Sequence, residues 1–180
     1  HKLSGENEDI RDLNCFYFDQ NQEILDPSFT LFDTIHESFP LMTNTEIRSL
    51  LGRFLFVEDD VFKKVEQLSG GEKVRLIFAL ISLKNYQILY LDEPTNHLDF
   101  TTKEVLADIL EDYQGTIIMV SHDRYFINRV ANKIVYLQDK KWLIESGNYQ
   151  DFLSLHQLEN NHFSYGLKKK KIEKKEIPNF

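Results

Sequence analysis

The chain has 180 residues, of which 42% are hydrophobic and 28% are charged, and its formal net charge is −8. This composition is typical of about one globular domain and excludes wholesale disorder. The single cysteine, Cys15, excludes a disulfide framework or a multi-cysteine metal site, and its apolar neighbours predict that it is buried. The sequence shows neither an uncharged apolar stretch of membrane-spanning length nor a signal peptide, so a cytoplasmic protein without membrane insertion is expected.

The charge is divided unevenly along the chain. Residues 166–180 carry a net charge of +4 and residues 1–165 carry −12. An acidic body is unlike a generic nucleic-acid clamp, whereas the basic end is able to contact phosphate locally. The first residue is His1 rather than Met, and we therefore expect a fragment, a processed chain or an excerpt of a longer chain.

The N-terminal half of the chain predicts a strand followed by helices. Residues 14–19 form a short, mostly apolar run of strand length. After a turn at residues 26–28, two helices are predicted, and the second begins with a capping box formed by Thr43 and Glu46. A third helix is predicted to start after Ser69 and to run to about residue 83. Its apolar residues recur on one face, namely Val74, Ile77, Phe78 and Ile81.

The C-terminal half alternates strands with helices. Residues 88–91 and 116–120 are continuous apolar runs, which are typical of parallel strands covered on both faces. Between them, Thr101 and Glu104 predict a capping box for a helix that Gly115 ends. A short helix at about 123–130, a hairpin with strands at 134–137 and 142–144, and a helix from Tyr149 are predicted to follow, with Trp142 in the hairpin core. This order predicts an α/β domain with a mainly parallel sheet and an inserted helical subdomain at about 29–83.

Two carboxylates follow the apolar run at 88–91. Asp92 and Glu93 are thereby delivered to the carboxyl edge of a parallel sheet, where α/β proteins bind their ligands. In a nucleotide site, Asp92 would hold Mg²⁺ and Glu93 would orient or deprotonate the attacking water. The alternative is a strand that ends in an acidic turn, with Pro94 as a breaker.

Three further segments are candidates for the same site. Residues 69–72 begin a helix whose unpaired N–H groups suit a phosphate, although a plain serine cap explains them equally. His122 follows the strand at 116–120 and is placed to contact a γ-phosphate or to position a water, or else residues 121–123 only cap the next helix. Gln20, after the first strand, is either a ligand to metal or water or an exposed polar residue.

In this order, the motifs resemble the nucleotide-binding domain of an ATP-binding cassette (ABC) ATPase over about residues 10–155. The resemblance implies a P-loop NTPase-like fold, ATP and Mg²⁺ as ligands, and ATP hydrolysis as the activity. It also implies one role for each matching residue: Gln20 for the Q-loop and the metal, Ser69, Gly70, Gly71 and Glu72 for the signature motif, Asp92 for the Walker B metal ligand, Glu93 for the catalytic base, Asp99 for the D-loop and His122 for the switch histidine.

The subfamily is narrowed by the run Glu93-Pro94-Thr95-Asn96-His97-Leu98-Asp99, which looks like the ABC-F version of the domain. Residues 59–64 resemble the second, C-terminal domain of such proteins. That placement makes residues 1–155 a partial nucleotide-binding domain and residues 156–180 a Lys-rich C-terminal extension. The resemblance implies a second nucleotide-binding domain in the same chain as one partner, and the ribosome, through rRNA or tRNA, as another, in translation or ribosome protection.

The chain departs from the family pattern in one respect. A P-loop, G-x-x-x-x-G-K-[ST], is expected upstream of Gln20, where Gly5 is the only glycine. Without it, we expect the chain alone to bind ATP poorly, to hydrolyse essentially none, and to expose sheet edge and apolar surface. Two alternatives stay open: the nucleotide-binding subunit of an ABC transporter, docked on membrane helices, and a non-catalytic truncated fragment.

Overall fold

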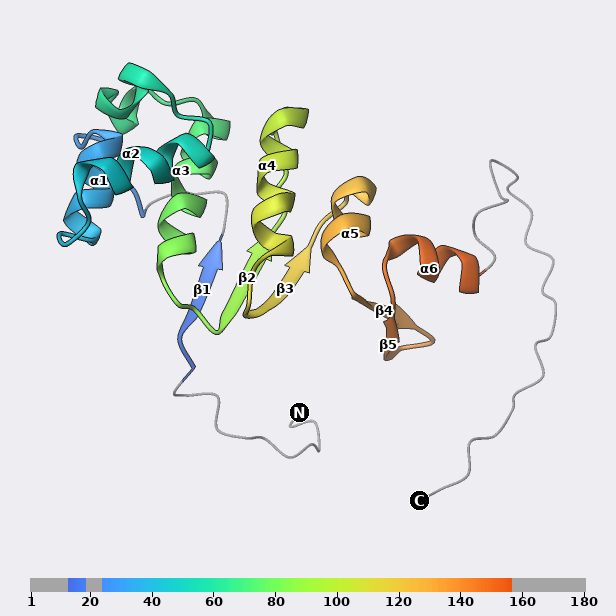
Figure 1. Ribbon diagram of the computed structural model, residues 1–180. Coiled ribbons are helices and arrows are strands. Elements are labelled where there is room, and N and C mark those ends of the chain that lie inside the picture. Colours follow the sequence, from blue (N-terminus) through green and yellow to red (C-terminus); the bar gives the residue numbers. More distant parts are fainter. Residues whose placement is uncertain (1–12, 19–23, 157–180) are drawn as a thin grey trace.

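The computed structural model describes residues 13–18 and 24–156 (Figure 1). Within these residues, three parallel strands lie in the order β1-β2-β3: β1 (Cys15–Phe18), β2 (Ile88–Asp92) and β3 (Thr116–Val120). A separate antiparallel hairpin consists of β4 (Lys133–Gln138) and β5 (Lys141–Ser146). The predicted α/β fold with a mainly parallel sheet is therefore confirmed.

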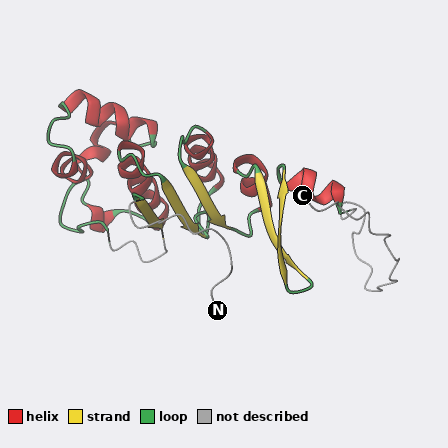
Figure 2. Ribbon diagram, turned by 90° about the horizontal axis from the view of Figure 1, so that it is seen from below, coloured by secondary structure: helices red, strands yellow, loops and turns green. Residues whose placement is uncertain are grey.

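Helices occupy most of the described chain between β1 and β2. These are α1 (Leu31–Ser38), α2 (Asn44–Arg53), the short 3-10 helices η2 (Glu58–Phe62) and η3 (Val65–Gln67), and α3 (Gly70–Leu83). Helix α4 (Phe100–Glu111) connects β2 to β3, α5 (Arg124–Val130) precedes the hairpin, and α6 (Tyr149–Leu155) follows it. Figure 2 shows that the helices around the three-stranded sheet lie on one side of it.

Side-chain caps set where the helices begin. The capping box predicted at Thr43 and Glu46 is present at the start of α2. The one predicted at Thr101 and Glu104 is wrong, because Asp99 caps α4 two residues earlier. Aspartate is among the strongest N-caps, and a helix that begins at Phe100 leaves the Glu104 side chain to face α5.

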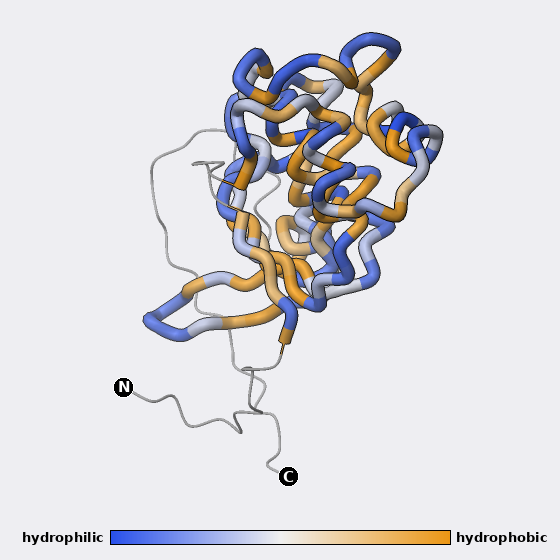
Figure 3. The backbone as a smooth tube through the Cα atoms, turned by 90° about the vertical axis from the view of Figure 1, so that its left-hand side faces the viewer, coloured by the Kyte–Doolittle hydropathy of each residue, from blue (hydrophilic) through white to orange (hydrophobic). Residues whose placement is uncertain are grey.

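The core lies between these helices and one face of the sheet. The predicted apolar face of α3 is buried, and Phe78 on it packs against Phe18 of β1, with ring centroids 5.4 Å apart. In Figure 3 hydrophobic and hydrophilic stretches alternate along the helices, as expected for helices with one buried face. The largest fully buried side chains are Phe54, Phe56, Phe78 and Phe126.

The opposite face of the sheet is uncovered within the described residues. Side chains of a strand alternate between its two faces, so Phe18 is buried while Cys15 and Tyr17 are exposed. On β3, Ile118 and Val120 are exposed in the same way. The prediction that Cys15 is buried is thus wrong. The prediction that the parallel strands are covered on both faces is also wrong. The exposed apolar surface that was expected is present.

The hairpin presents an apolar stripe on one face. Leu137 lies opposite Trp142 in the ladder, and Val135 lies opposite Ile144, and all four side chains are exposed. Tyr136 alternates to the other face and packs on α6. The predicted core position of Trp142 is therefore wrong, because its strand register places it on the face away from α6.

Gly115 is required by a close approach in the turn between α4 and β3. A Cβ atom there would lie 2.6 Å from the Tyr113 ring and 2.9 Å from the backbone carbonyl oxygens of Tyr86 and Gln87. The Tyr113 hydroxyl donates a hydrogen bond to the Tyr86 carbonyl at 2.5 Å, which holds this turn against the start of β2. The glycine therefore sets how closely the helix returns to the sheet.

Candidate active site

The carboxyl ends of β2 and β3 bring two predicted segments together. Because the strands are parallel neighbours, Asp92 pairs with Val120, and the residues that follow each strand meet at one edge. The Glu93 N–H donates to the Val120 carbonyl at 2.9 Å and extends the ladder by one residue. Gln20, predicted to join this edge from β1, lies outside the described residues.

Glu93 is held in an unusual backbone conformation. Its φ of +47° lies in the left-handed region, and its carbonyl accepts a hydrogen bond from the Asn96 N–H at 3.1 Å, which closes a turn. A positive φ at a non-glycine residue costs free energy and is enriched at functional sites. The turn directs the side chain back across the strand ends toward His122.

The two oxygens of the Glu93 carboxylate differ in their hydrogen bonding. Oε2 accepts a hydrogen bond from the His122 backbone N–H at 3.2 Å. Oε1 is buried without a hydrogen-bond partner among the described residues, and the His122 ring nitrogen Nε2 lies 3.5 Å away from it. An unpaired buried carboxylate oxygen is expensive unless a ligand or water uses it, so Oε1 is a suitable proton acceptor.

The His122 side chain is 95% exposed, whereas that of Glu93 is only 16% exposed. The histidine ring is therefore available to a ligand. The position of the ring depends on the backbone of residues 121–123. The Ser121 hydroxyl lies 3.4 Å from that of Thr95, and the Asp123 carboxylate caps α5 by accepting from the Phe126 N–H at 3.1 Å. The capping role considered for residues 121–123 is thus present together with the exposed histidine.

Asp92 ends β2 as an exposed carboxylate. Its Oδ2 lies 3.5 Å from the hydroxyl of Tyr17 on β1. One exposed carboxylate fits Mg²⁺ in a nucleotide site, because that ion keeps several waters and shares phosphate oxygens of the substrate. Groups of three or more His, Cys, Asp or Glu side chains that could hold a metal are absent from the described ranges.

The segment at 69–72 begins α3 as a complete capping box. The Ser69 hydroxyl donates to Glu72 Oε2 at 2.7 Å and accepts from the Glu72 N–H at 3.3 Å. The hydroxyl hydrogen bond, aided by the Ser69 N–H and partly opposed by burial, holds the pKa of Glu72 below its usual value. Both interpretations of this segment, a phosphate site and a plain serine cap, stay compatible with the geometry, because the cap leaves Gly70 and Gly71 at the helix start.

Gly70 and Gly71 are not explained by local structure. Neither has a positive φ, and a Cβ atom added to Gly70 would meet nothing within 4 Å. One added to Gly71 would meet only ordinary contacts, with Leu98 at 3.6 Å and Thr102 at 4.0 Å. Glycine weakens a helix, and the open space at Gly70 suits a surface that receives something from outside the described chain.

Asp99 lies at the start of α4 and is connected to α3 through Thr102. Its Oδ1 accepts from the Thr102 N–H at 2.8 Å, and this bond holds the pKa of Asp99 below its usual value despite some desolvation. The Thr102 hydroxyl in turn accepts from Arg75 Nη1 of α3 at 2.9 Å. Arg75, Thr102 and Lys103 were not predicted as site residues. The only sequence signal for them is that they lie within the motifs or next to them.

The described part of the chain contains no helix long and apolar enough to cross a membrane.

Comparisons with known proteins agree on one family. A family model described as ABC transporter matches residues 2–96. The chain is 51% identical over 121 residues to YdiF of Bacillus subtilis (strain 168), described as an ATP-binding protein, with 67% of this chain and 19% of that protein covered. It is 44% identical over 138 residues to ABC transporter F family member 5 of Arabidopsis thaliana, with 76% of this chain and 20% of that protein covered.

A solved dimeric structure of MJ0796, a bacterial ABC transporter cassette, is similar at a TM-score of 0.58 and 27% identity, over 76% of this chain and 64% of that chain. The chain spans about one fifth of the length of the two curated relatives that it matches.

Proposed function

Because this chain belongs to the ATP-binding cassette family and its relatives include ABC-F proteins, we propose that it serves ATP binding and hydrolysis in a tandem ABC-F ATPase. The observation that carries the proposal is the pairing of Glu93 with His122 at adjacent strand ends, with one buried carboxylate oxygen left unpaired. A carboxylate so placed suits the activation of water beside a terminal phosphate.

In the proposed reaction, a water attacks the γ-phosphorus of ATP, and the bond to the oxygen bridging the β- and γ-phosphates breaks to give ADP and phosphate. Glu93 accepts the proton of the attacking water, for which Oε1 is the oxygen without a partner. The exposed His122 ring contacts the γ-phosphate. Asp92 and Gln20 would hold Mg²⁺, which would supply positive charge to the phosphate oxygens.

The signature segment serves a second nucleotide in this proposal. Ser69, Gly70 and Gly71 face the γ-phosphate held by a partner nucleotide-binding domain, and Asp99 lies at the same interface. The open space above Gly70 supports this role, because it is the kind of surface on which a phosphate or a second backbone can approach closely. ATP then closes the two domains, and loss of the γ-phosphate releases them.

The domain arrangement follows from the same resemblance. We place residues 1–155 as part of the second nucleotide-binding domain, with the helical subdomain at about 29–83, and residues 156–180 as a Lys-rich extension. Because the sequence contains no P-loop pattern, this chain alone is expected to bind ATP weakly and not to turn it over. Activity belongs to the native polypeptide that contains the chain.

The partner proposed for that polypeptide is the ribosome, in the cytoplasm, where the six lysines of residues 166–180 would contact rRNA or tRNA. Cosedimentation separates this role from transport. Recovery with ribosomes supports it, whereas recovery with membranes supports the transporter subunit. Deleting residues 166–180 is expected to weaken ribosome binding most at low salt, and equal binding at every salt concentration contradicts the role of the lysines.

The catalytic assignment is tested by Glu93→Gln in the native polypeptide. The amide keeps the shape of the side chain and the acceptor for the His122 N–H but loses the basic oxygen. Nucleotide binding is expected to persist while steady-state ATP hydrolysis falls at least about a hundredfold. Hydrolysis at the wild-type rate contradicts the role of Glu93, and a wild-type polypeptide that does not hydrolyse ATP contradicts the proposed function.

A further inference from the structure

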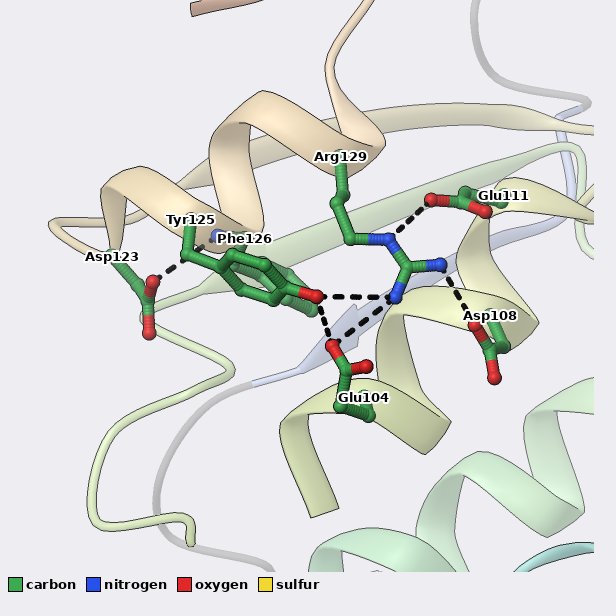
Figure 4. Close-up of polar contacts among 7 residues, drawn as sticks. All are labelled: Glu104, Asp108, Glu111, Asp123, Tyr125, Phe126 and Arg129. Carbon is green, nitrogen blue, oxygen red and sulfur yellow. Dashed lines mark hydrogen bonds and ion pairs between the residues drawn. The ribbon is translucent and has the colours of Figure 1, made fainter. Parts of the chain in front are cut away.

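Helix α5 is held on α4 by a charged contact at each end. At its start, Lys103 Nζ on α4 lies 2.5 Å from Oδ2 of Asp123, the residue that caps α5. At its other end, Arg129 reaches three carboxylates of α4, as Figure 4 shows. Guanidinium nitrogens lie 3.2, 2.7 and 2.7 Å from Glu104, Asp108 and Glu111, respectively.

The Asp123 carboxylate accepts hydrogen bonds from both helices. Oδ1 accepts from the Phe126 N–H at 3.1 Å, which caps α5, and Oδ2 accepts from Lys103. The Lys103 and Asp123 side chains are 26% and 17% exposed, so solvent screens their attraction less than on an open surface. Burial raises the pKa of Asp123, but the hydrogen bonds from Lys103 and Phe126 outweigh it and the net pKa is lowered.

The residue before Lys103 connects the same turn of α4 to α3. The Thr102 hydroxyl accepts from Arg75 at 2.9 Å and donates to Asp99 Oδ2 at 3.2 Å, while the Thr102 side chain is buried. Arg75 also lies over the ring of Phe56, with its guanidinium carbon 5.1 Å from the centroid. One turn of α4 therefore holds α3 through Thr102 and the start of α5 through Lys103.

We propose that the first turn of α4, residues 99–103, is a mechanical link between the signature helix α3 and the His122 segment, in which Lys103 is the positioning residue for His122. The link rests on the proposed function, because it assigns Lys103 to the placement of the histidine of that site. Lys103 acts through Asp123 and touches neither His122 nor Glu93.

The need for such an anchor follows from the exposure of His122. Its ring is 95% exposed, so neighbouring side chains do not pack it into place. The backbone of residues 121–123 is tied to the Glu93 turn by the His122 N–H and by the contact of Ser121 with Thr95. The Lys103 contact adds a tie to a different element, α4. Displacement of a reacting group by about 1 Å can cost about a hundredfold in rate.

Two variants break the contact in the native polypeptide without removing the cap of α5. Lys103→Met removes the cation, and Asp123→Asn keeps a capping oxygen but loses the charge. Each is expected to lower kcat for ATP about tenfold while KM stays within about twofold, because positioning changes the reacting geometry more than binding. The double variant is expected to be no slower than the slower single variant.

Matched substitutions separate positioning from loss of a lysine. Lys103→Arg keeps a cation and is expected to retain most of kcat, while Lys141→Met, at the exposed start of β5, is expected to leave kcat unchanged. A kcat within about twofold of wild type in both Lys103→Met and Asp123→Asn overturns the proposal. Effects that multiply in the double variant also overturn it, because the two residues would then act independently.

Amide hydrogen exchange tests the link without ATP. Lys103→Met is expected to speed exchange at the His122 and Phe126 amides, which are bonded to Glu93 and Asp123. Arg75→Leu is expected to speed exchange at the Thr102 amide and at the same two amides. Unchanged protection at His122 and Phe126 in Lys103→Met overturns the link. If the native polypeptide shows no Glu93-dependent hydrolysis, the proposed function is contradicted, and hydrogen exchange alone then tests the link.

Discussion

The backbone N–H of His122 donates to Glu93 Oε2 at 3.2 Å, across 29 positions of sequence. The contact exists because β2 and β3 are parallel neighbours whose carboxyl ends meet at one edge. It fixes the carboxylate through one oxygen and leaves Oε1 toward the exposed ring. The backbone thus orients the base, and the side chain of His122 stays available to the substrate.

Removal of the His122 ring is expected to separate activity from folding. Because the ring is 95% exposed, His122→Ala should leave the thermal unfolding midpoint of the native polypeptide unchanged. The Glu93 contact persists because its donor is the backbone. ATP hydrolysis should nevertheless fall about a hundredfold in a steady-state assay. His36→Ala, on the exposed side of α1, is the matched control, and an equal loss in both variants argues against a specific role for His122.

Gly70→Ala is expected to stabilise the fold and to impair the function. A Cβ at this position meets nothing within 4 Å, and the backbone is helical, so alanine should add about 0.5 kcal/mol to the free energy of unfolding. The same methyl group occupies the open surface proposed to meet the γ-phosphate of the partner domain. Nucleotide-dependent closure and hydrolysis should therefore decrease. A variant that gains stability and keeps full hydrolysis indicates that the open surface receives no ligand.

Arg129 is expected to stabilise the packing of α5 on α4. Arg129→Met removes one cation from three carboxylates and should lower the free energy of unfolding by about 1–2 kcal/mol, less at 1 M salt. Arg129→Lys should recover only part of this, because an ammonium lacks the guanidinium fork. Denaturant unfolding measures both. Arg124→Met, an exposed arginine on the same helix, serves as the comparison, and an equal effect there shows that the network adds nothing.

The acid stability of the fold is expected to depend on Asp99. Its pKa is lowered in the folded state, chiefly by the Thr102 N–H, so its contribution to stability is complete above the unfolded value of about 4. That contribution is lost as the pH falls through the folded pKa. Asp99→Asn keeps a capping oxygen without titrating, and should lose less stability than wild type between about pH 4 and pH 2. Identical acid unfolding curves for the two proteins contradict this dependence.

Local chemistry made much of the fold predictable. The capping box at Thr43 and the serine cap at Ser69 lie where the sequence predicts them, because each forms within four consecutive residues. The strand predicted at 88–91, observed as Ile88–Asp92, and the carboxylates at its end were likewise predictable, since an apolar run followed by charge ends a buried strand in most contexts. The Thr101 box failed because two overlapping signals competed and the stronger cap, Asp99, began the helix earlier.

The exposed residues could not be predicted, because burial is a property of what covers a surface. Cys15 and Trp142 lie in strands whose existence was predicted, with boundaries that differ by one or two residues, yet both point to faces that no described element covers. Alternation along a strand tells which residues share a face, but not which face meets a helix.

The sequence by itself determined the order of elements, the helix starts other than that of α4, and the residue types at the carboxyl edge of the sheet, because these depend on neighbours in the chain. Tertiary structure alone decided that Glu93 leaves one oxygen unpaired beside His122 and that Lys103 meets Asp123. These contacts join residues 20 or more positions apart, and they depend on strand register, helix packing and rotamers, which only the assembled fold sets.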